Sequence, residues 1–285
     1  MSDIPFMKDG RFLVSKLHVS PNLQSSIERA IDLIGGIESV IKPGDTVTIK
    51  PNLNTGDPYP ASSDPHFIHA LGKILLGAGV EKLRIADSST IKVHSRDVAQ
   101  RISLDEVADH LGAEMIYLED HDWIKMKFPK ARYMKNGHLG APILDPGKIV
   151  LVPCLKTHRL ARFTASMKLL VGWLRKRDRM LMHARKMEAK VVDLASYFRP
   201  SLIVMDARTI FTTGGPMSGT IENPGFVLAS SDMVSIDVEG VRILQSYEAK
   251  NRLDMDVWDI PQIRHAVNIG IGAKSDDDIL VIEPQ

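Results

Sequence analysis

The sequence predicts an α/β protein built on a mostly parallel, doubly wound sheet with helices on both faces. Short, nearly continuous apolar segments alternate with amphipathic helical patterns along most of the chain. Such segments are typical of strands buried on both faces, and parallel strands need helical crossovers between them. With 285 residues, 44% of them hydrophobic, the chain can form one large domain, and two lobes around a cleft are compatible with this pattern.

In the first part of the chain, β-branched apolar segments predict strands and capping residues predict helices. Ser20 before Pro21, and Asp64 before Pro65, are typical of an N-cap with proline at the first helical position. Ser103, with acidic residues two and three positions later, indicates another helix start. The strands expected here are Arg11–Val19, Thr46–Lys50, Leu83–Ala86 and Met115–Leu118.

In the second part of the chain, helical patterns dominate from about residue 162 to 198, and another helix is expected up to about Leu244. Residues 121–143 lack a clear period, and we expect an insertion or a small antiparallel excursion there. Neither an internal repeat nor a low-complexity linker is found, so residues 1–285 are treated as one unit. The strands expected here are Lys148–Leu155, Leu202–Met205, Phe226–Ala229 and Ile279–Ile282.

Composition excludes several classes of protein. The net charge of +1 and the ordinary charged fraction exclude a polyelectrolyte and extensive disorder. The single Cys154 cannot form an internal disulfide, a thiolate zinc site or a cysteine-ligated iron–sulfur cluster within this chain. Because residues 1–10 resemble no signal peptide and no apolar stretch approaches 18 residues, we expect a cytoplasmic protein that is not held in a membrane.

Polar runs follow five of the expected strands, at the point where each strand ends. In an open parallel sheet the ligand crevice lies outside those carboxyl ends, so residues far apart in sequence converge there. Polar residues after strands also cap helices or form turns, and Asp232 is the residue best explained in that way. The runs begin at Lys50, Asp87, Lys156, Asp206 and Ser230.

The lysines among these residues indicate an anionic ligand. Lys50 and Lys156 directly continue apolar strands, which would bring a charge close to the sheet edge unless an anion meets it. Lys168 lies among apolar neighbours, and His158 is a candidate acid, base or metal ligand near neutral pH. A cleft formed by Lys50, Asp87, Lys156, His158, Lys168, Asp206 and Gly215 is therefore predicted, and Asn52 is a further candidate for ligand binding.

A glycine-rich segment is a second candidate for anion binding. Gly214, Gly215 and Gly219 fall within seven residues of one another and can expose backbone N–H groups to an anion, although a surface turn explains them equally well. The ten histidines do not fall into metal-ligand spacing, and His66 with His69 is read as a helix surface pair. No metal site is predicted, and the sequence does not identify a cofactor.

The segment from Lys156 to Lys190 is strongly basic, with 11 lysines and arginines against two acids. Such a field concentrates phosphates, carboxylates or nucleic acid. Within it, Arg175–Arg179 is expected to be a solvated or partner-facing segment outside the chemical centre, because burying four cations together needs several anions. Nucleic acid is the less favoured partner, since only 6% of the residues are aromatic and no RNA-binding signature is found.

An ordered set of short motifs resembles the domain of unknown function 362 family from about residue 46 to 272. The resemblance implies an α/β fold, a prokaryotic distribution and association with ferredoxin-like iron–sulfur modules, and it implies no particular activity. Leu169 stands where members usually have Asn, and the ferredoxin cysteines are absent, so any such cluster belongs to another chain. The motifs are Lys50-Pro51-Asn52-Leu53, Ala86-Asp87-Ser88, Lys156-Thr157-His158, Met167-Lys168 with Gly172, Asp206-Ala207, Gly214-Gly215-Pro216 with Gly219, and Ser230-Ser231-Asp232 with Asp237.

A looser resemblance links this architecture to the lactate-racemase-type nickel-pincer enzymes, in which a lysine carries the cofactor. Lys168 would be the corresponding residue, and the analogy is one of fold.

Two main hypotheses of function follow. The first is an enzyme, redox-linked or with nickel-pincer-like chemistry, in which three lysines neutralise an anionic ligand, the glycine-rich loop donates hydrogen bonds, and His158 or Asp87 moves a proton. The alternative is a non-catalytic ligand-binding protein or an assembly partner of a ferredoxin-like iron–sulfur protein. Nucleic-acid binding comes third.

Overall fold

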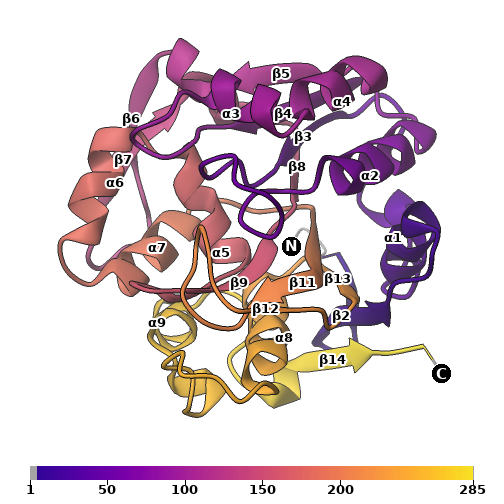
Figure 1. Cartoon of the computed structure of the whole chain (residues 1–285). Helices are drawn as coiled ribbons and strands as arrows, with labels where there is room; N and C mark the ends of the chain where they lie inside the picture. The colour runs from indigo at the N-terminus through magenta and orange to yellow at the C-terminus, as the bar shows by residue number, and fades with distance from the viewer. Residues whose placement is uncertain (1–4, 285) are drawn as a thin grey trace.

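One sheet of 12 strands runs through residues 5–284, the part of the chain that this computed structural model describes. The main path of the sheet has the strand order β1-β2-β13-β11-β8-β3-β4-β5 (Figure 1). Its strands are β1 (Met7–Lys8), β2 (Arg11–His18), β3 (Thr46–Lys50), β4 (Lys82–Asp87), β5 (Glu114–Tyr117), β8 (Lys148–Leu151), β11 (Leu202–Phe211) and β13 (Phe226–Ser230). Of the N-terminal segment considered for a targeting signal, residues 1–4 lie outside the described range.

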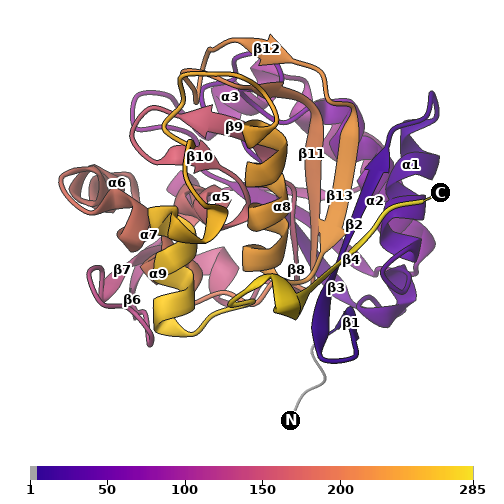
Figure 2. The same ribbon diagram turned by 90° about the horizontal axis from the view of Figure 1, so that it is seen from below.

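Most neighbouring strands of the main path are parallel, which confirms the predicted α/β class. β11, β8, β3, β4 and β5 form one parallel series. Four further strands attach to its members: β9 (Cys154–His158) and β12 (Ile221–Glu222) pair with β11, β10 (Arg162–Thr164) pairs with β9, and β14 (Ile279–Ile282) pairs with β2. Figure 2 shows the long β11 beside β13 at the centre of the molecule.

β13 is the exception, because it runs antiparallel to both of its neighbours, β11 and β2. Ser230 therefore pairs with Ile203 near the start of β11, at the sheet edge opposite the carboxyl ends of the parallel strands. The predicted convergence of all five polar runs is thus wrong for Ser230–Asp232. Asp232 instead accepts a hydrogen bond from Ser235 N, at 2.9 Å, as the N-cap of the next helix.

Helices cover both faces of the sheet, as predicted, and each face has its own apolar core (Figure 2). One core includes Ile27, Phe67 and Val98, and the other includes Met167, Val192 and Val238. Helices α1 (Leu23–Asp32), α2 (Pro65–Gly77), α3 (Ser95–Arg101) and α4 (Leu104–Leu111) contribute to the first core, and α5 (Ser166–Leu169), α6 (Lys176–His183), α7 (Met187–Ala195), α8 (Met233–Gln245) and α9 (Pro261–Ile269) contribute to the second.

Several local features differ from the sequence expectation. The expected strand Lys148–Leu155 is two strands, because Pro153 has no N–H for the ladder and its carbonyl accepts from Asp206 N at 2.9 Å instead. The cap of α1 is Asn22, whose side chain accepts from Ser25 N at 3.1 Å, and not Ser20. β10 lies within the stretch expected to be helical.

Residues 121–143 contain a two-stranded antiparallel sheet, formed by β6 (Trp123–Lys127) and β7 (Asn136–Gly140). Buried Asp193 of α7 accepts hydrogen bonds from the backbone N–H groups of Arg132, Tyr133 and Met134 and from His265 of α9. The connection between β6 and β7 is therefore fastened to the helical layer. Within residues 5–284, no helix has the length and apolar character needed to cross a membrane.

Candidate functional site

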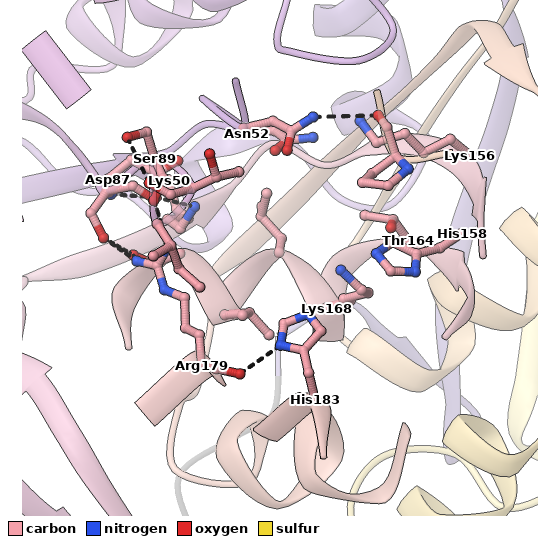
Figure 3. A pocket seen from close by; sticks show the side chains of 18 residues that line it. Lys50, Asn52, Asp87, Ser89, Lys156, His158, Thr164, Lys168, Arg179 and His183 are labelled. Carbon is pink, nitrogen blue, oxygen red and sulfur yellow. Dashed lines mark hydrogen bonds and ion pairs between the residues drawn. The ribbon is translucent and has the colours of Figure 1, made fainter. Parts of the chain in front are cut away.

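A cavity of about 220 Å³ lies at the carboxyl ends of β3, β4 and β9. We call it the strand-end cavity, and Figure 3 shows its side chains converging from these strands, from β10, α5 and α6, and from the loops between them. Of the residues predicted for one cleft, it is lined by Lys50, Asp87, Lys156, His158 and Lys168, and the ligand-binding candidate Asn52 lines it as well. The other lining residues are Asn54, Ser88, Ser89, Thr90, Ile91, Thr164, Leu169, Val171, Gly172, Arg179, His183 and Pro216.

Lys50 and Asp87 form a buried ion pair on neighbouring strands, β3 and β4. Lys50 Nζ lies 2.8 Å from Asp87 Oδ1 and 2.7 Å from the carbonyl oxygen of Pro51, and both side chains are almost fully buried. Burial lowers the pKa of Lys50 and raises the pKa of Asp87, while their mutual attraction opposes both shifts. Asp87 also accepts from Leu53 N and Ser88 N, so both of its oxygens have partners within the protein.

Gly172 makes room for this ion pair. A Cβ atom at this position would lie 2.2 Å from Asp87 Oδ1 and 2.7 Å from Lys50 Nζ. Any side chain here would displace one of the two charged groups, which gives a physical reason for the glycine that follows the Met167-Lys168 motif.

Lys156 of β9 is held in the cavity wall by two backbone carbonyls and by no carboxylate. Its Nζ donates to the carbonyl oxygens of Pro60 at 2.6 Å and Ala61 at 2.8 Å, and the residue has no solvent exposure. Burial lowers the pKa of Lys156 to about 8, although the charge of Asp206 behind it opposes this shift. An ammonium group held only by neutral dipoles leaves its positive charge largely uncompensated.

Lys168 of α5 points into the cavity, and none of residues 5–284 forms a hydrogen bond or ion pair with its amine (Figure 3). Burial and the charges of Lys156 and Arg179 lower the pKa of Lys168 to about 7. Its helix is fixed by Asp237 of α8, whose carboxylate accepts from Ser166 N at 2.7 Å and Met167 N at 3.2 Å. The backbone at the start of this helix is therefore held in place, while the Lys168 amine has no partner among residues 5–284.

Thr164 of β10 is a second unpartnered group in the cavity wall. Its side chain is 5% exposed, and its Oγ1 has no hydrogen-bond partner among the described residues. An unsatisfied buried hydroxyl costs free energy unless a ligand or water meets it. Thr164 and Lys168 thus mark the part of the cavity where the protein leaves hydrogen-bonding capacity unused.

Two histidines of the cavity are held in complementary tautomers by the backbone. His158 Nδ1 accepts from Leu160 N and Ala161 N, both at 3.1 Å, so its single proton is on Nε2. The Nδ1 atom of His183 lies 2.5 Å from the carbonyl oxygen of Arg179 and must donate to it, which leaves Nε2 as an acceptor. Burial and the neighbouring charge of Lys168 lower the pKa of His158 far below its usual range, so the predicted titration of His158 near neutrality is wrong.

Arg179 corrects the expectation that Arg175–Arg179 is a solvated segment outside the chemical centre. Only 6% of Arg179 is exposed, and its guanidinium donates to the carbonyls of Leu174, Ser89 and Gly172 at 2.6 Å each, and also to Ser88. A planar group with five N–H donors can join several backbone carbonyls at once. The other arginines of the run remain partly or fully exposed.

Asp206 lies outside the cavity lining, as the buried member of a partly buried cluster that we call the Asp206 network: Tyr59, Asp64, Asp206 and Arg208. Tyr59 Oη donates to Asp206 at 2.6 Å, and Arg208 Nη2 lies 2.7 Å from Asp206 and 2.6 Å from Asp64. Burial alone would lower the pKa of Arg208, but its hydrogen bonds to Asp206 raise this pKa. Asp206 is mid-strand in β11, because that strand extends six residues beyond its predicted end at Met205.

The glycines of the predicted anion loop also lie outside the cavity lining, which only Pro216 of this loop joins. Gly214 and Gly215 have positive φ angles, and the Gly215 N–H already donates to the carbonyl oxygen of Ser218 at 2.8 Å. A Cβ atom at Gly215 would lie 1.8 Å from Thr157 O, and one at Gly219 would lie 1.9 Å from Thr213 O. Close backbone packing against β9 therefore accounts for Gly215, and packing within the loop accounts for Gly219.

The sequence interpretation did not single out three residues of the cavity: Thr164, Arg179 and His183. Arg179 and His183 lie one helical turn apart on α6, and that spacing is the sequence signal that would have placed them on a shared face. Thr164 gives no such signal, since its position depends on the turn that returns β10 along β9. Among residues 5–284, no group of three or more His, Cys, Asp and Glu side chains is arranged to hold a metal ion.

Comparison with known proteins adds a family and two similar proteins. The model of the family described as Domain of unknown function (DUF362) matches residues 47–242. The Thylakoid-associated protein sll1697 of Synechocystis sp. is 24% identical over 253 residues, which cover 84% of this chain and 75% of that protein. The lactate racemase apoprotein from Thermoanaerobacterium thermosaccharolyticum is similar with a TM-score of 0.44 and 14% identity, over 84% of this chain and 61% of that one. The chain thus spans about three fifths of the length of that lactate racemase.

Proposed function

The chain belongs to the family described as Domain of unknown function (DUF362), and we propose that it binds a small anionic ligand, phosphorylated or carboxylate, in the strand-end cavity. The observation that carries this proposal is an imbalance of charge. Lys50, Lys156, Lys168 and Arg179 line the cavity with a single carboxylate, Asp87. Because Asp87 is paired with Lys50, the remaining cations have no anion of their own in the lining.

The free-energy cost of burying unpaired cations supports an anion as the missing partner. Burying a cation without a counter-charge is strongly unfavourable, and proteins commonly relieve this cost by shifting the pKa of the group or by binding an ion. Both Lys156 and Lys168 have lowered pKa values, of about 8 and about 7. A bound phosphate or carboxylate would offset the charges of Lys156 and Arg179, and it would accept hydrogen bonds from Thr164 and from the Lys168 amine in either of its protonation states.

We propose an enzyme rather than a passive binding protein, because reactive groups surround the ligand position. Lys168 supplies an amine that is neutral in part at physiological pH, and His158 supplies a neutral Nε2–H donor. Asn52 contributes a side-chain amide to the same wall. Asp87 acts in this proposal by holding Lys50, since its oxygens are already engaged.

The alternative function, a non-catalytic partner of a ferredoxin-like iron–sulfur protein, stays a prediction, as do the cytoplasmic location and the redox-linked chemistry. Turnover of a bound ligand would separate an enzyme from this alternative.

Titration calorimetry of the whole chain tests the proposed binding. Phosphate and L-lactate should bind, and the neutral compound glycerol should not. Lys168→Met should weaken anion binding by about 2 kcal/mol, roughly thirtyfold, because it removes a charge-assisted hydrogen bond. The exposed Lys73 of α2 offers the matched control, and Lys73→Met should leave affinity unchanged. Equal binding of glycerol and the anions, or unchanged affinity in Lys168→Met, would contradict the proposal.

A further inference from the structure

We propose that the Lys168 amine forms an imine with a small anion that carries an aldehyde or ketone group next to its charge, such as a 2-oxo acid or a phosphorylated aldehyde. This inference rests on the proposed function, because the neighbouring cations must first hold the carboxylate or phosphate group. The strand-end cavity, about 220 Å³, has room for a small ligand of this kind.

The first argument is that the three lysines of the cavity are not equivalent. Lys50 Nζ is engaged by Asp87 and the Pro51 carbonyl, and Lys156 Nζ is engaged by two carbonyls. Lys168 Nζ has no such partner among residues 5–284. A lysine can attack a carbonyl carbon only with a free lone pair, so Lys168 is the one of the three that is suited to do so.

The second argument concerns the protonation of Lys168. Lys156 and Arg179 are positively charged neighbours of Lys168, and their repulsion disfavours an ammonium group on Lys168. Burial acts in the same direction and brings its pKa to about 7. An amine desolvated beside other cations is the general arrangement that makes a lysine nucleophilic near neutral pH.

The third argument is that the groups needed around the reaction are present. His158 Nε2–H can donate a hydrogen bond to the carbonyl oxygen, and His183 Nε2 can accept a proton. Both rings line the same cavity as Lys168, and after burial the charges of Lys168 and His183 have the largest influence on the pKa of His158. Figure 3 shows the Lys168 amine between the two rings in projection.

The step balances without any further reactant. The Lys168 nitrogen attacks the carbonyl carbon, a C–N bond forms, and the carbonyl π bond breaks to give an alkoxide beside an ammonium group. His183 Nε2 takes a proton from nitrogen and returns it to oxygen, which gives a carbinolamine. The remaining N–H proton is passed to the hydroxyl group in the same way, the C–O bond breaks, and water leaves with both original amine protons.

Reductive trapping tests this inference. The whole chain is incubated with pyruvate or glycolaldehyde phosphate in the presence of sodium cyanoborohydride, and the modified peptides are identified by mass spectrometry. We expect one reduced adduct, located on Lys168, with at least one of the two compounds, and the one that reacts tells whether a carboxylate or a phosphate is recognised. L-lactate and glycerol phosphate, which lack the carbonyl group, should bind without labelling.

Two variants and the pH profile make the test specific. Lys168→Arg keeps the positive charge but has no nucleophilic amine, so labelling should be lost, whereas the surface variant Lys73→Arg should label like the original chain. Labelling of Lys168 should rise from about pH 6 to about pH 8, where surface lysines stay largely protonated.

The outcomes separate the two proposals. If calorimetry detects pyruvate, lactate or the phosphates in the cavity and neither carbonyl compound labels Lys168, the imine is excluded and the proposed anion binding stands. Labelling spread over surface lysines, with Lys168 no more reactive than the rest, also overturns the imine. If none of the four anions binds, the proposed function fails, and this inference fails with it.

Discussion

The strand-end cavity and the Asp206 network both bury charged side chains at the carboxyl-end side of the same sheet, yet they are built in opposite ways. In the Asp206 network every carboxylate oxygen of Asp206 has a donor, and Arg208 lies between two acids. In the cavity the Lys168 amine and the Thr164 hydroxyl have no partner within residues 5–284. A complete set of partners indicates a group that stabilises the fold, whereas an incomplete set indicates a group kept for a ligand.

Asp206→Ala should give the largest effect, a loss of about 3 kcal/mol in the free energy of unfolding, because it leaves Tyr59 and Arg208 without their buried acceptor. Urea denaturation measures this difference. The exposed Glu248→Ala serves as the control and should stay within about 0.5 kcal/mol. If Asp206→Ala changed the free energy of unfolding as little as Glu248→Ala does, the network would not stabilise the fold.

Gly172→Ala should cost about 2 kcal/mol in the free energy of unfolding, because the added Cβ would displace the Lys50–Asp87 pair. Anion affinity should fall in the same variant. Gly77→Ala in α2 is the matched control, since a Cβ atom there meets no other atom within 4 Å, and alanine is the better helix former. Retention of full stability in Gly172→Ala would mean that the ion pair tolerates displacement.

Anion affinity should fall as the pH rises above about 7, by up to roughly tenfold per pH unit for each proton lost, as Lys168 and then Lys156 lose their charges. The free energy of unfolding of the ligand-free protein should follow the opposite trend. The folded-state pKa of Lys168 lies below that of an exposed lysine, so the unfolded chain binds more protons above about pH 7, and this group makes the ligand-free protein more stable as pH rises. Calorimetry at several pH values, with denaturation of the same samples, measures both trends.

Constant affinity across this pH range would contradict the assignment of the binding charge to these two lysines. The stability slope between about pH 7 and 9 should be shallower in Lys168→Met than in the original chain, because the titrating amine is gone.

Lys168→Met should give the smallest stability effect, and with the opposite sign to Asp206→Ala. Replacing a half-buried amine that has no partner within residues 5–284 by an apolar side chain of similar length should raise the free energy of unfolding at neutral pH by about 1 kcal/mol. Thermal unfolding of the two variants side by side checks the contrast. Destabilisation of Lys168→Met by as much as Asp206→Ala would show that Lys168, too, is part of the structural framework.

Most of the fold could be predicted from local patterns. The strand at Ile279–Ile282 and the helix start at Asp64-Pro65 were predicted as observed, because period and capping are properties of adjacent residues. The antiparallel course of β13 could not be predicted, since an isolated apolar strand carries no sign of its direction. That direction takes Asp232 away from the cavity edge.

Part of the candidate site could likewise be predicted from the sequence, and part of it could not. Lys50, Asp87 and Lys156 could be chosen from sequence because each directly ends or follows an apolar strand, and strand ends meet at one sheet edge. Whether such a residue is satisfied depends on partners remote in sequence: Pro60 and Ala61 for Lys156, and Tyr59 for Asp206. Asp206 and Lys168 were therefore both predicted to line the cleft. In the structure only Lys168 lines the strand-end cavity, and Asp206 has protein partners on both of its oxygens.

The sequence by itself determined the alternation of strands and helices, the balance of charges, and the lysines that continue apolar strands toward one sheet edge. These features depend only on residue type and spacing. The tertiary structure decided which charges are paired, that Arg179 turns inward, that the backbone fixes the tautomers of His158 and His183, and that the glycine loop packs instead of opening into the cavity. Pairing and burial are relations between residues distant along the chain, and only the folded arrangement of β3, β4, β9 and α6 sets them.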